Sequence, residues 1–149
     1  MAEIFNNISE HSRYDIGSVF GQYFPNENTI IIAVSDMGLG IPANVRKLRS
    51  ELSDPAAIVQ AVKQGFTTKS VATNTGMGLD QLLRSVVSGL GGSVTIYSGA
   101  GIVTFEPRSG AIGHRGTRGV GLCPGTTIEI GLDPRRVPNQ PANEEDIEW

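Results

Sequence analysis

Cysteine is almost missing from this sequence, with Cys123 the only one among 149 residues. One cysteine excludes an internal disulfide framework and a four-thiolate zinc site, and it fits a reducing cytoplasm. No apolar run approaches the roughly 18 residues that a membrane span needs, and the first residues lack the basic and apolar segments of a signal peptide. Positive charge is not in excess either, since the net charge is −3. We therefore expect a soluble cytoplasmic segment that contacts neither membrane nor nucleic acid.

The sequence has enough apolar material for a packed core. Hydrophobic residues make up 39% of the chain, and its length suits one domain. Glycine is the unusual component, at 19 residues, nearly twice the usual share of about 7%. The glycines form no repeat, so each group needs a local explanation.

The hydrophobic pattern predicts an α+β fold. Leu79 to Leu90 has apolar residues at helical spacing and ends at Gly91-Gly92, which predicts a helix. Asp54-Pro55 predicts a helix start, with Asp54 as the N-cap. We expect a two-layer sandwich, with a mixed, mostly antiparallel sheet covered on one face by about three helices. The other predicted segments are a helix over 2–12, strands over 16–24 and 29–35, a mobile loop over 66–76, a hairpin of strands 94–97 and 102–105, a long loop over 107–125, a last strand over 126–132 and a disordered acidic, proline-rich tail over 134–149.

Glu3, Asn7 and His11 recur at i, i+4 and i+8, so they share one face of the first predicted helix. An amide oxygen suits Mg²⁺, and a carboxylate one turn away can orient or deprotonate a hydroxyl. A solvated helix face explains the same pattern.

Asp36 follows the apolar strand and is followed by Gly38 and Gly40. A carboxylate at a strand end can accept a hydrogen bond from an exocyclic amine, and glycines let the backbone approach a flat ring closely. A plain strand-to-loop turn is the alternative.

The segment Thr75-Gly76-Met77-Gly78-Leu79 opens the strongest predicted helix. Free N–H groups at a helix N-terminus favour an anion such as phosphate. The segment is neither a Walker-type loop nor a dinucleotide fingerprint. Thr126, at the start of the last strand, can hydrogen-bond a base or a water, although ordinary β-propensity also explains it.

In this order, the four segments resemble the GHKL ATPase superfamily over residues 3 to about 132. The matching parts are an N box (Glu3, Asn7), a G1 box (Asp36 to Pro42), a G2 box (Thr75 to Leu79) and a closing Gly125 to Ile130 strand. Phe66 to Lys69 is similar to the ATP lids of histidine kinases.

The resemblance implies that ATP and Mg²⁺ are the cofactors. It assigns Mg²⁺ to Asn7 and the adenine amino group to Asp36. Thr126 would support Asp36 and the adenine, and Gly38 and Gly40 would give room for the base. Gly76 and Gly78 would let the lid pass over the phosphates, and the ATP-binding segment also includes Thr75, Met77 and Leu79. Lys69 in that lid can reach the γ-phosphate as a point charge, and a solvated lysine is the alternative. Glu3 is the implied catalytic base.

The implied function is the ATP-binding catalytic domain of a bacterial-type signalling kinase, either a histidine kinase or an anti-sigma serine kinase. Its partner would be a protein phosphoacceptor or a regulated protein. Two alternatives are an ATP-gated switch ATPase of the topoisomerase and mismatch-repair type, and a nucleotide-binding regulatory module without catalysis. Glu3 lies nearly at the first residue, whereas family members have more chain before the N box. We therefore expect residues 1–133 to be a GHKL-type domain from a longer protein, such as a larger sensor, with dimerisation through the missing N-terminal region.

Overall fold

Four antiparallel strands form the single sheet of the computed structural model, which describes residues 17–63 and 78–138. The sheet order is β1-β2-β4-β3, and all three strand pairs are antiparallel. The strands are β1 (Gly17–Phe24), β2 (Thr29–Asp36), β3 (Ser93–Arg108) and β4 (Ala111–Leu132). The predicted α+β class is confirmed, and all pairing among the four described strands is antiparallel, whereas a mixed sheet was expected.

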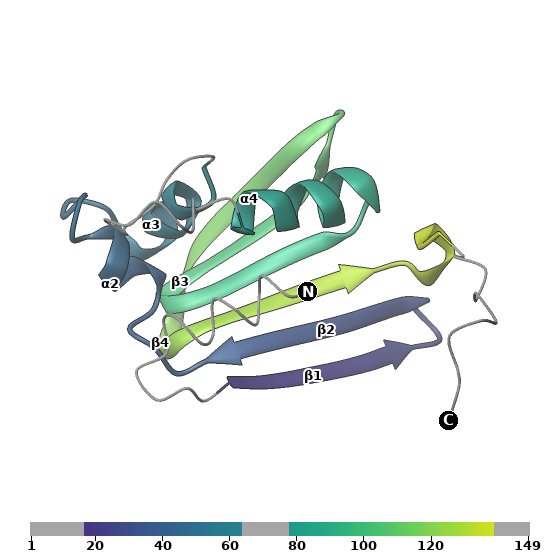
Figure 1. Ribbon diagram of the computed structural model, residues 1–149, viewed down its shortest axis with the longest axis horizontal. Helices are drawn as coiled ribbons and strands as arrows, with labels where there is room; N and C mark the ends of the chain where they lie inside the picture. Colours follow the sequence, from purple (N-terminus) through teal and green to yellow (C-terminus); the bar gives the residue numbers. More distant parts are fainter. Residues whose placement is uncertain (1–16, 64–77, 139–149) are drawn as a thin grey trace, which may run out of the picture.

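Short helices pack against β3 and β4 (Figure 1). They are α2 (Ile41–Val45), α3 (Asp54–Ala61) and α4 (Gly78–Leu83), which continues into the π-helical segment η1 (Arg84–Gly89). A short 3-10 helix, η2 (Pro134–Arg136), follows β4. Within the described residues no helix is long and apolar enough to cross a membrane.

The core lies between the helices and the β3–β4 side of the sheet. The predicted helix over 79–90 is present as α4 and η1, and its apolar residues Leu83, Val86 and Val87 are buried as predicted, although Val86 and Val87 lie in the π-helical part. The helix ends where Gly91 adopts a φ of +61°, and the N–H of Leu90 donates to the carbonyl of Ser85. The buried core cluster consists of Val34, Ile58, Val62, Leu83, Val86, Val87, Val94, Ile96, Val103, Phe105, Ile128 and Ile130.

The expected long loop over 107–125 is wrong, because this segment comprises the end of β3, a two-residue turn and the first part of β4. Residues 102–108 pair with 111–117, and the connection is Ser109-Gly110. Both turn residues have positive φ, +49° and +81°, as a two-residue type I′ hairpin requires. This part of the strand is hard to predict from sequence, because it is rich in glycine and arginine and shows no alternation of apolar and polar residues. Its hydrogen bonds to the neighbouring strand are made by the backbone, which every sequence provides.

The expected hairpin of strands 94–97 and 102–105 lies within β3, and each of the two segments also pairs with β4. The register with β4 shifts between Ser98 and Gly101, and this irregular stretch of β3 is called the bulge below. The hydroxyls of Thr95 and Thr104 approach to 3.1 Å although nine residues separate them, whereas a straight strand of that length would hold them about 30 Å apart. The chain therefore reverses direction at the bulge, and the two segments lie side by side as the expected hairpin requires.

The remaining predictions have mixed outcomes. Strands close to 16–24, 29–35 and 126–132 are present. The N-cap of α3 is Ser53, and Asp54 is the first helical residue instead of the cap. The predicted tail begins with η2, and its part from residue 139 onward lies outside the described residues, as do the predicted helix over 2–12 and the loop over 66–76.

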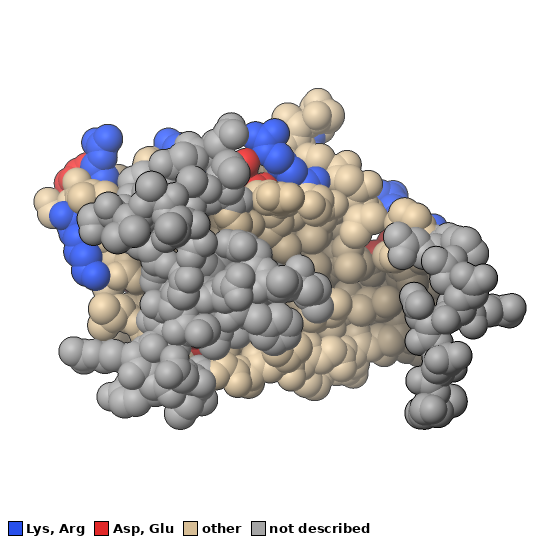
Figure 2. All heavy atoms as spheres, in the orientation of Figure 1, with Lys and Arg blue, Asp and Glu red and all other residues tan. Residues whose placement is uncertain are grey.

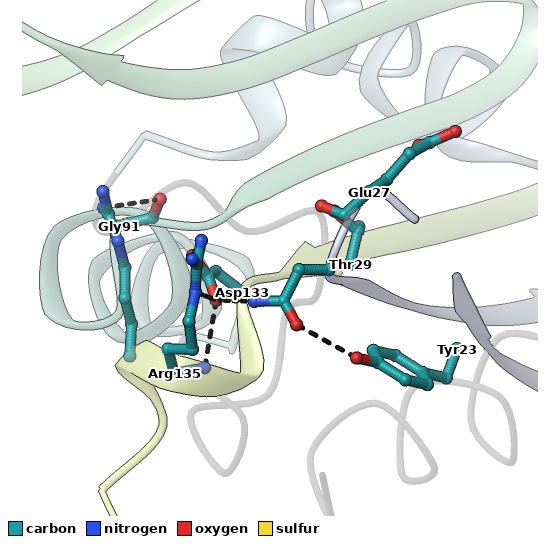
Figure 3. A network of polar contacts seen from close by, with 8 residues as sticks. Tyr23, Glu27, Thr29, Gly91, Asp133 and Arg135 are labelled. Carbon is teal, nitrogen blue, oxygen red and sulfur yellow. Dashed lines mark hydrogen bonds and ion pairs between the residues drawn. The ribbon is translucent and has the colours of Figure 1, made fainter. Parts of the chain in front are cut away.

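A polar network ties the end of β4 to the β1–β2 turn (Figure 3). The Tyr23 hydroxyl donates to Asn28, whose Nδ2 donates to the Asp133 carboxylate, each at 3.0 Å. The Arg135 side chain and backbone N–H also donate to Asp133, and these bonds hold the pKa of that carboxyl at about 2. Asp133 therefore stays ionised at ordinary pH and remains an acceptor for both partners.

Candidate functional site

Asp36 lies at the end of β2 and starts a tight turn. Its Oδ1 accepts the backbone N–H of Gly38 at 2.7 Å, an arrangement that aspartate favours in turns. An ionised carboxylate has about four lone-pair sites, so one such bond leaves acceptor capacity for a further donor. On either side of Gly38, the apolar side chains of Met37 and Leu39 are about half exposed, at 54% and 52%. A carboxylate is thus set among exposed apolar groups.

Gly125 and Gly40 bring the β4 strand and the turn after β2 into direct contact. Gly125 has a φ of +73°, and a Cβ there would collide with the carbonyl oxygen of Asp36. Gly40 has a φ of +80°, and a Cβ there would lie 2.8 Å from both the Gly125 carbonyl oxygen and the Ser98 hydroxyl. Both positions therefore require glycine in the folded chain itself, with or without a ligand.

Ser98 joins three segments at the centre of this contact. Its fully buried hydroxyl donates to the carbonyl of Gly125 at 2.7 Å and accepts the N–H of Ile41 at 2.9 Å. The same hydroxyl lies 3.1 Å from the Thr126 hydroxyl. Because a buried hydroxyl must be hydrogen-bonded, this arrangement fixes the turn after β2 relative to β3 and β4.

Thr126 lies beside Asp36 in the sheet. It pairs with Asp36 on β2 and with Ser98 on β3, so the three side chains share one face. Only 8% of Thr126 is exposed. The sheet thus unites Asp36 with a residue that is far away in the sequence.

Asp54 supports the bulge next to Ser98. Its Oδ2 accepts the N–H of Ala100 at 2.6 Å, and its Oδ1 forms an ion pair with Arg46. Burial alone would raise the pKa of Asp54, but the Ala100 and Arg46 hydrogen bonds outweigh it and the pKa is lowered. A Cβ on Gly99, whose φ is +59°, would lie 2.6 Å from the same carboxylate oxygen. The bulge therefore packs directly against the first turn of α3.

The structure brings four of the predicted site residues together: Asp36, Gly38, Gly40 and Thr126. Gly78 and Leu79 form the start of α4, where Leu79 packs partly against the core. In Figure 1, α4 begins on the side of the sheet toward which β2 ends. The other predicted residues, Glu3, Asn7, Lys69, Thr75, Gly76 and Met77, lie outside the described residues.

Sequence reasoning identifies neither Ser98 nor the hydrogen bond by which Asp54 holds the backbone of Ala100. The pattern Ser98-Gly99-Ala100-Gly101 favours a turn, although glycine within a strand also marks a bulge or a close approach of another backbone. A close approach is observed at Gly101, where a Cβ would lie 2.8 Å from Ile58 and 2.9 Å from the Asp54 backbone.

Comparison with protein-family models and with curated protein sequences gives no match. Residues 17–63 and 78–138 hold no group of three or more His, Cys, Asp or Glu side chains that could bind a metal ion.

Proposed function

We propose that this chain is the ATP-binding domain of a GHKL-type signalling kinase, which transfers a phosphoryl group from Mg·ATP to a protein. The observation that carries this proposal is the Asp36 carboxylate at the end of an inner strand, in contact with Gly38 and Gly125 and paired with Thr126. The sequence resemblance places Asp36, Gly38 and Thr126 at the adenine. The proposal also assigns the α+β structure to a particular fold, that of the histidine-kinase-like ATPases.

The arrangement suits an adenine base chemically. The carboxylate can accept a hydrogen bond from the exocyclic amine, which guanine does not offer at that position. The half-exposed side chains of Met37 and Leu39 supply apolar surface for a flat ring. Ser98 holds the turn in place, so little ordering is required on binding.

Phosphate and metal binding rest on the sequence. Asn7 would hold Mg²⁺, the segment from Thr75 to Leu79 would donate backbone N–H groups to the phosphates, and Lys69 would add charge. The ion would neutralise charge on the phosphates. Glu3 would accept the proton of the attacking group.

Calorimetric titration with Mg·ADP tests the proposal. We expect Mg²⁺-dependent binding to the wild-type chain, and a loss of about 10- to 100-fold in Asp36→Asn, because a hydrogen bond to a charged group contributes roughly 1.5–3 kcal/mol. The side-chain amide oxygen in this variant can still accept the Gly38 N–H, so the turn keeps its hydrogen bond.

Glu51→Gln is the matched control, since Glu51 is exposed and has the same change of charge. Its affinity should equal that of the wild type. Absence of Mg·ADP binding to the wild-type chain, or equal binding by Asp36→Asn, would refute the proposal. Glu3→Gln should bind ADP normally and lose phosphoryl transfer, which separates a kinase from a module that only binds nucleotide.

A further inference from the structure

β1 forms an edge of the sheet in the described part of the chain, with β2 on its other side. Natural edge strands are usually blunted by charged side chains, by proline or by a bulge. The strand Gly17–Phe24, with the sequence GSVFGQYF, contains no charged residue and no proline. Its pairing with β2 runs without a register shift from Gly17 to Phe24. The strand therefore has none of these three protections.

Large apolar side chains project from this strand on both faces. Val19 and Tyr23 are 51% exposed and Phe20 is 57% exposed. Val19 pairs with the buried Val34, so Val19 and Tyr23 lie on the face that carries the helices, and Phe20 lies on the other face. Neither β1 nor β2 contains Lys or Arg, and the Lys and Arg side chains visible in Figure 2 lie mostly toward the upper and left margins.

Gly21, at the middle of the strand, has no explanation within the described fold. Its φ is not positive, and a Cβ built on it meets no atom within 4 Å. Glycine within a strand costs roughly 0.5–1 kcal/mol relative to alanine. Because a paired strand lies in the plane of the sheet and a Cβ points out of that plane, Gly21 does not hinder pairing at this edge, and its open surroundings leave room for a substitution.

Tyr23 is held in place by a hydrogen bond before any strand pairs at this edge. Its hydroxyl donates to Asn28, which is bound to Asp133 in the network of Figure 3. A side chain held in one orientation loses little conformational entropy when a partner covers it.

We propose that β1 pairs in antiparallel fashion with β1 of a second copy of this chain, with Gly21 on the two-fold axis. The two sheets then form one continuous sheet across the interface. In this register Val19 lies opposite Tyr23 of the partner subunit, a favourable aromatic and β-branched pair, and Phe20 lies opposite the partner's Gln22. The residue numbers of each opposed pair must differ by an even number, because opposed residues point to the same face of the sheet.

The strand itself favours a second copy as the occupant. Because β1 is uncharged, self-pairing places no like charges opposite each other, and an isologous contact requires a self-complementary patch. A partner selected by charge would need charged residues on the edge, and β1 has none. This interface is independent of the proposed nucleotide site.

A disulfide tests the register directly. The variant is Gly21→Cys in a Cys123→Ser background, because Cys123 is the only native cysteine. Opposed residues of antiparallel strands have Cα atoms about 4.5–5.5 Å apart, within disulfide range. We expect a covalent dimer under mild oxidation. Gly17→Cys in the same background is the control, because its two copies would lie about 26 Å apart, and it should stay monomeric in denaturing gels.

Light scattering over a dilution series tests the dimer without a disulfide. The wild-type chain should show twice the monomer mass and Phe20→Lys the monomer mass. Leu48→Lys, at another exposed apolar residue, should remain dimeric. A monomeric wild-type chain, or a dimer that Gly21→Cys does not crosslink more than Gly17→Cys, would overturn the proposal. Circular dichroism should show that each variant retains the wild-type fold.

Discussion

At the scale of single residues, the Asp54 carboxylate shows how one side chain can hold three segments. It binds the bulge through Ala100 and the α2–α3 connection through Arg46, while it begins α3 itself. Its side chain is only 16% exposed, so the ionised form depends on these hydrogen bonds. The lowered pKa of Asp54 means that the folded state favours the ionised carboxylate more than the unfolded state does.

This difference predicts the pH dependence of stability. A lowered folded-state pKa contributes stability above the unfolded value, near 3.8, and this contribution is lost as pH falls toward the folded value. Asp54→Asn should be less stable than wild type by about 1–2 kcal/mol at neutral pH, and the difference should shrink below about pH 4. Urea denaturation at several pH values measures both. Asp80→Asn, which breaks the surface pair with Arg84, should cost less than about 0.5 kcal/mol at neutral pH. An Asp54→Asn deficit that is unchanged at low pH would contradict the assignment.

At the scale of elements, the hairpin of β3 and β4 depends on its turn. Ser109 has a φ of +49°, which serine adopts less readily than asparagine, and Asn-Gly is the preferred type I′ pair. Ser109→Asn should therefore stabilise the chain by a few tenths of a kcal/mol up to about 1 kcal/mol, measured by urea denaturation. Ser109→Val should destabilise it, because a β-branched residue is strained at positive φ. Equal stability of the two variants would show that the hairpin does not contribute to global unfolding.

The elements that could be predicted are those in which the pattern of apolar and polar residues follows which side chains are buried. The 79–90 helix has its apolar residues on one face, and β2 is an apolar run, so spacing alone identifies both. The part of β4 from Ala111 to Pro124 is mostly exposed, so its side chains carry no pattern. Asp36 could be proposed from local sequence, whereas Ser98 could not, because its partners are 57 and 27 residues away.

At the scale of the whole molecule, the sheet separates two polar centres. Asn28 and Asp133 close one end of β2 and β4, and Asp36 and Thr126 lie at the other end. Between them lies the full length of β2, which has 8 residues and so spans about 26 Å. Effects of mutations at such a distance are usually additive, so stability and ligand binding should be separable in this chain.

Asn28→Ala tests this separation. Asn28 has a φ of +49°, which alanine tolerates poorly, and the change removes its bonds to Tyr23 and Asp133. We expect a loss of about 1–2 kcal/mol in the free energy of unfolding with Mg·ADP affinity unchanged. Asn28→Gly, which removes the same bonds without the backbone strain, should recover part of the loss. In Asn28→Ala/Asp36→Asn, the effects on unfolding should add to within about 0.5 kcal/mol. A larger coupling would mean that the sheet transmits the state of one end to the other, and the two centres would then be one cooperative unit.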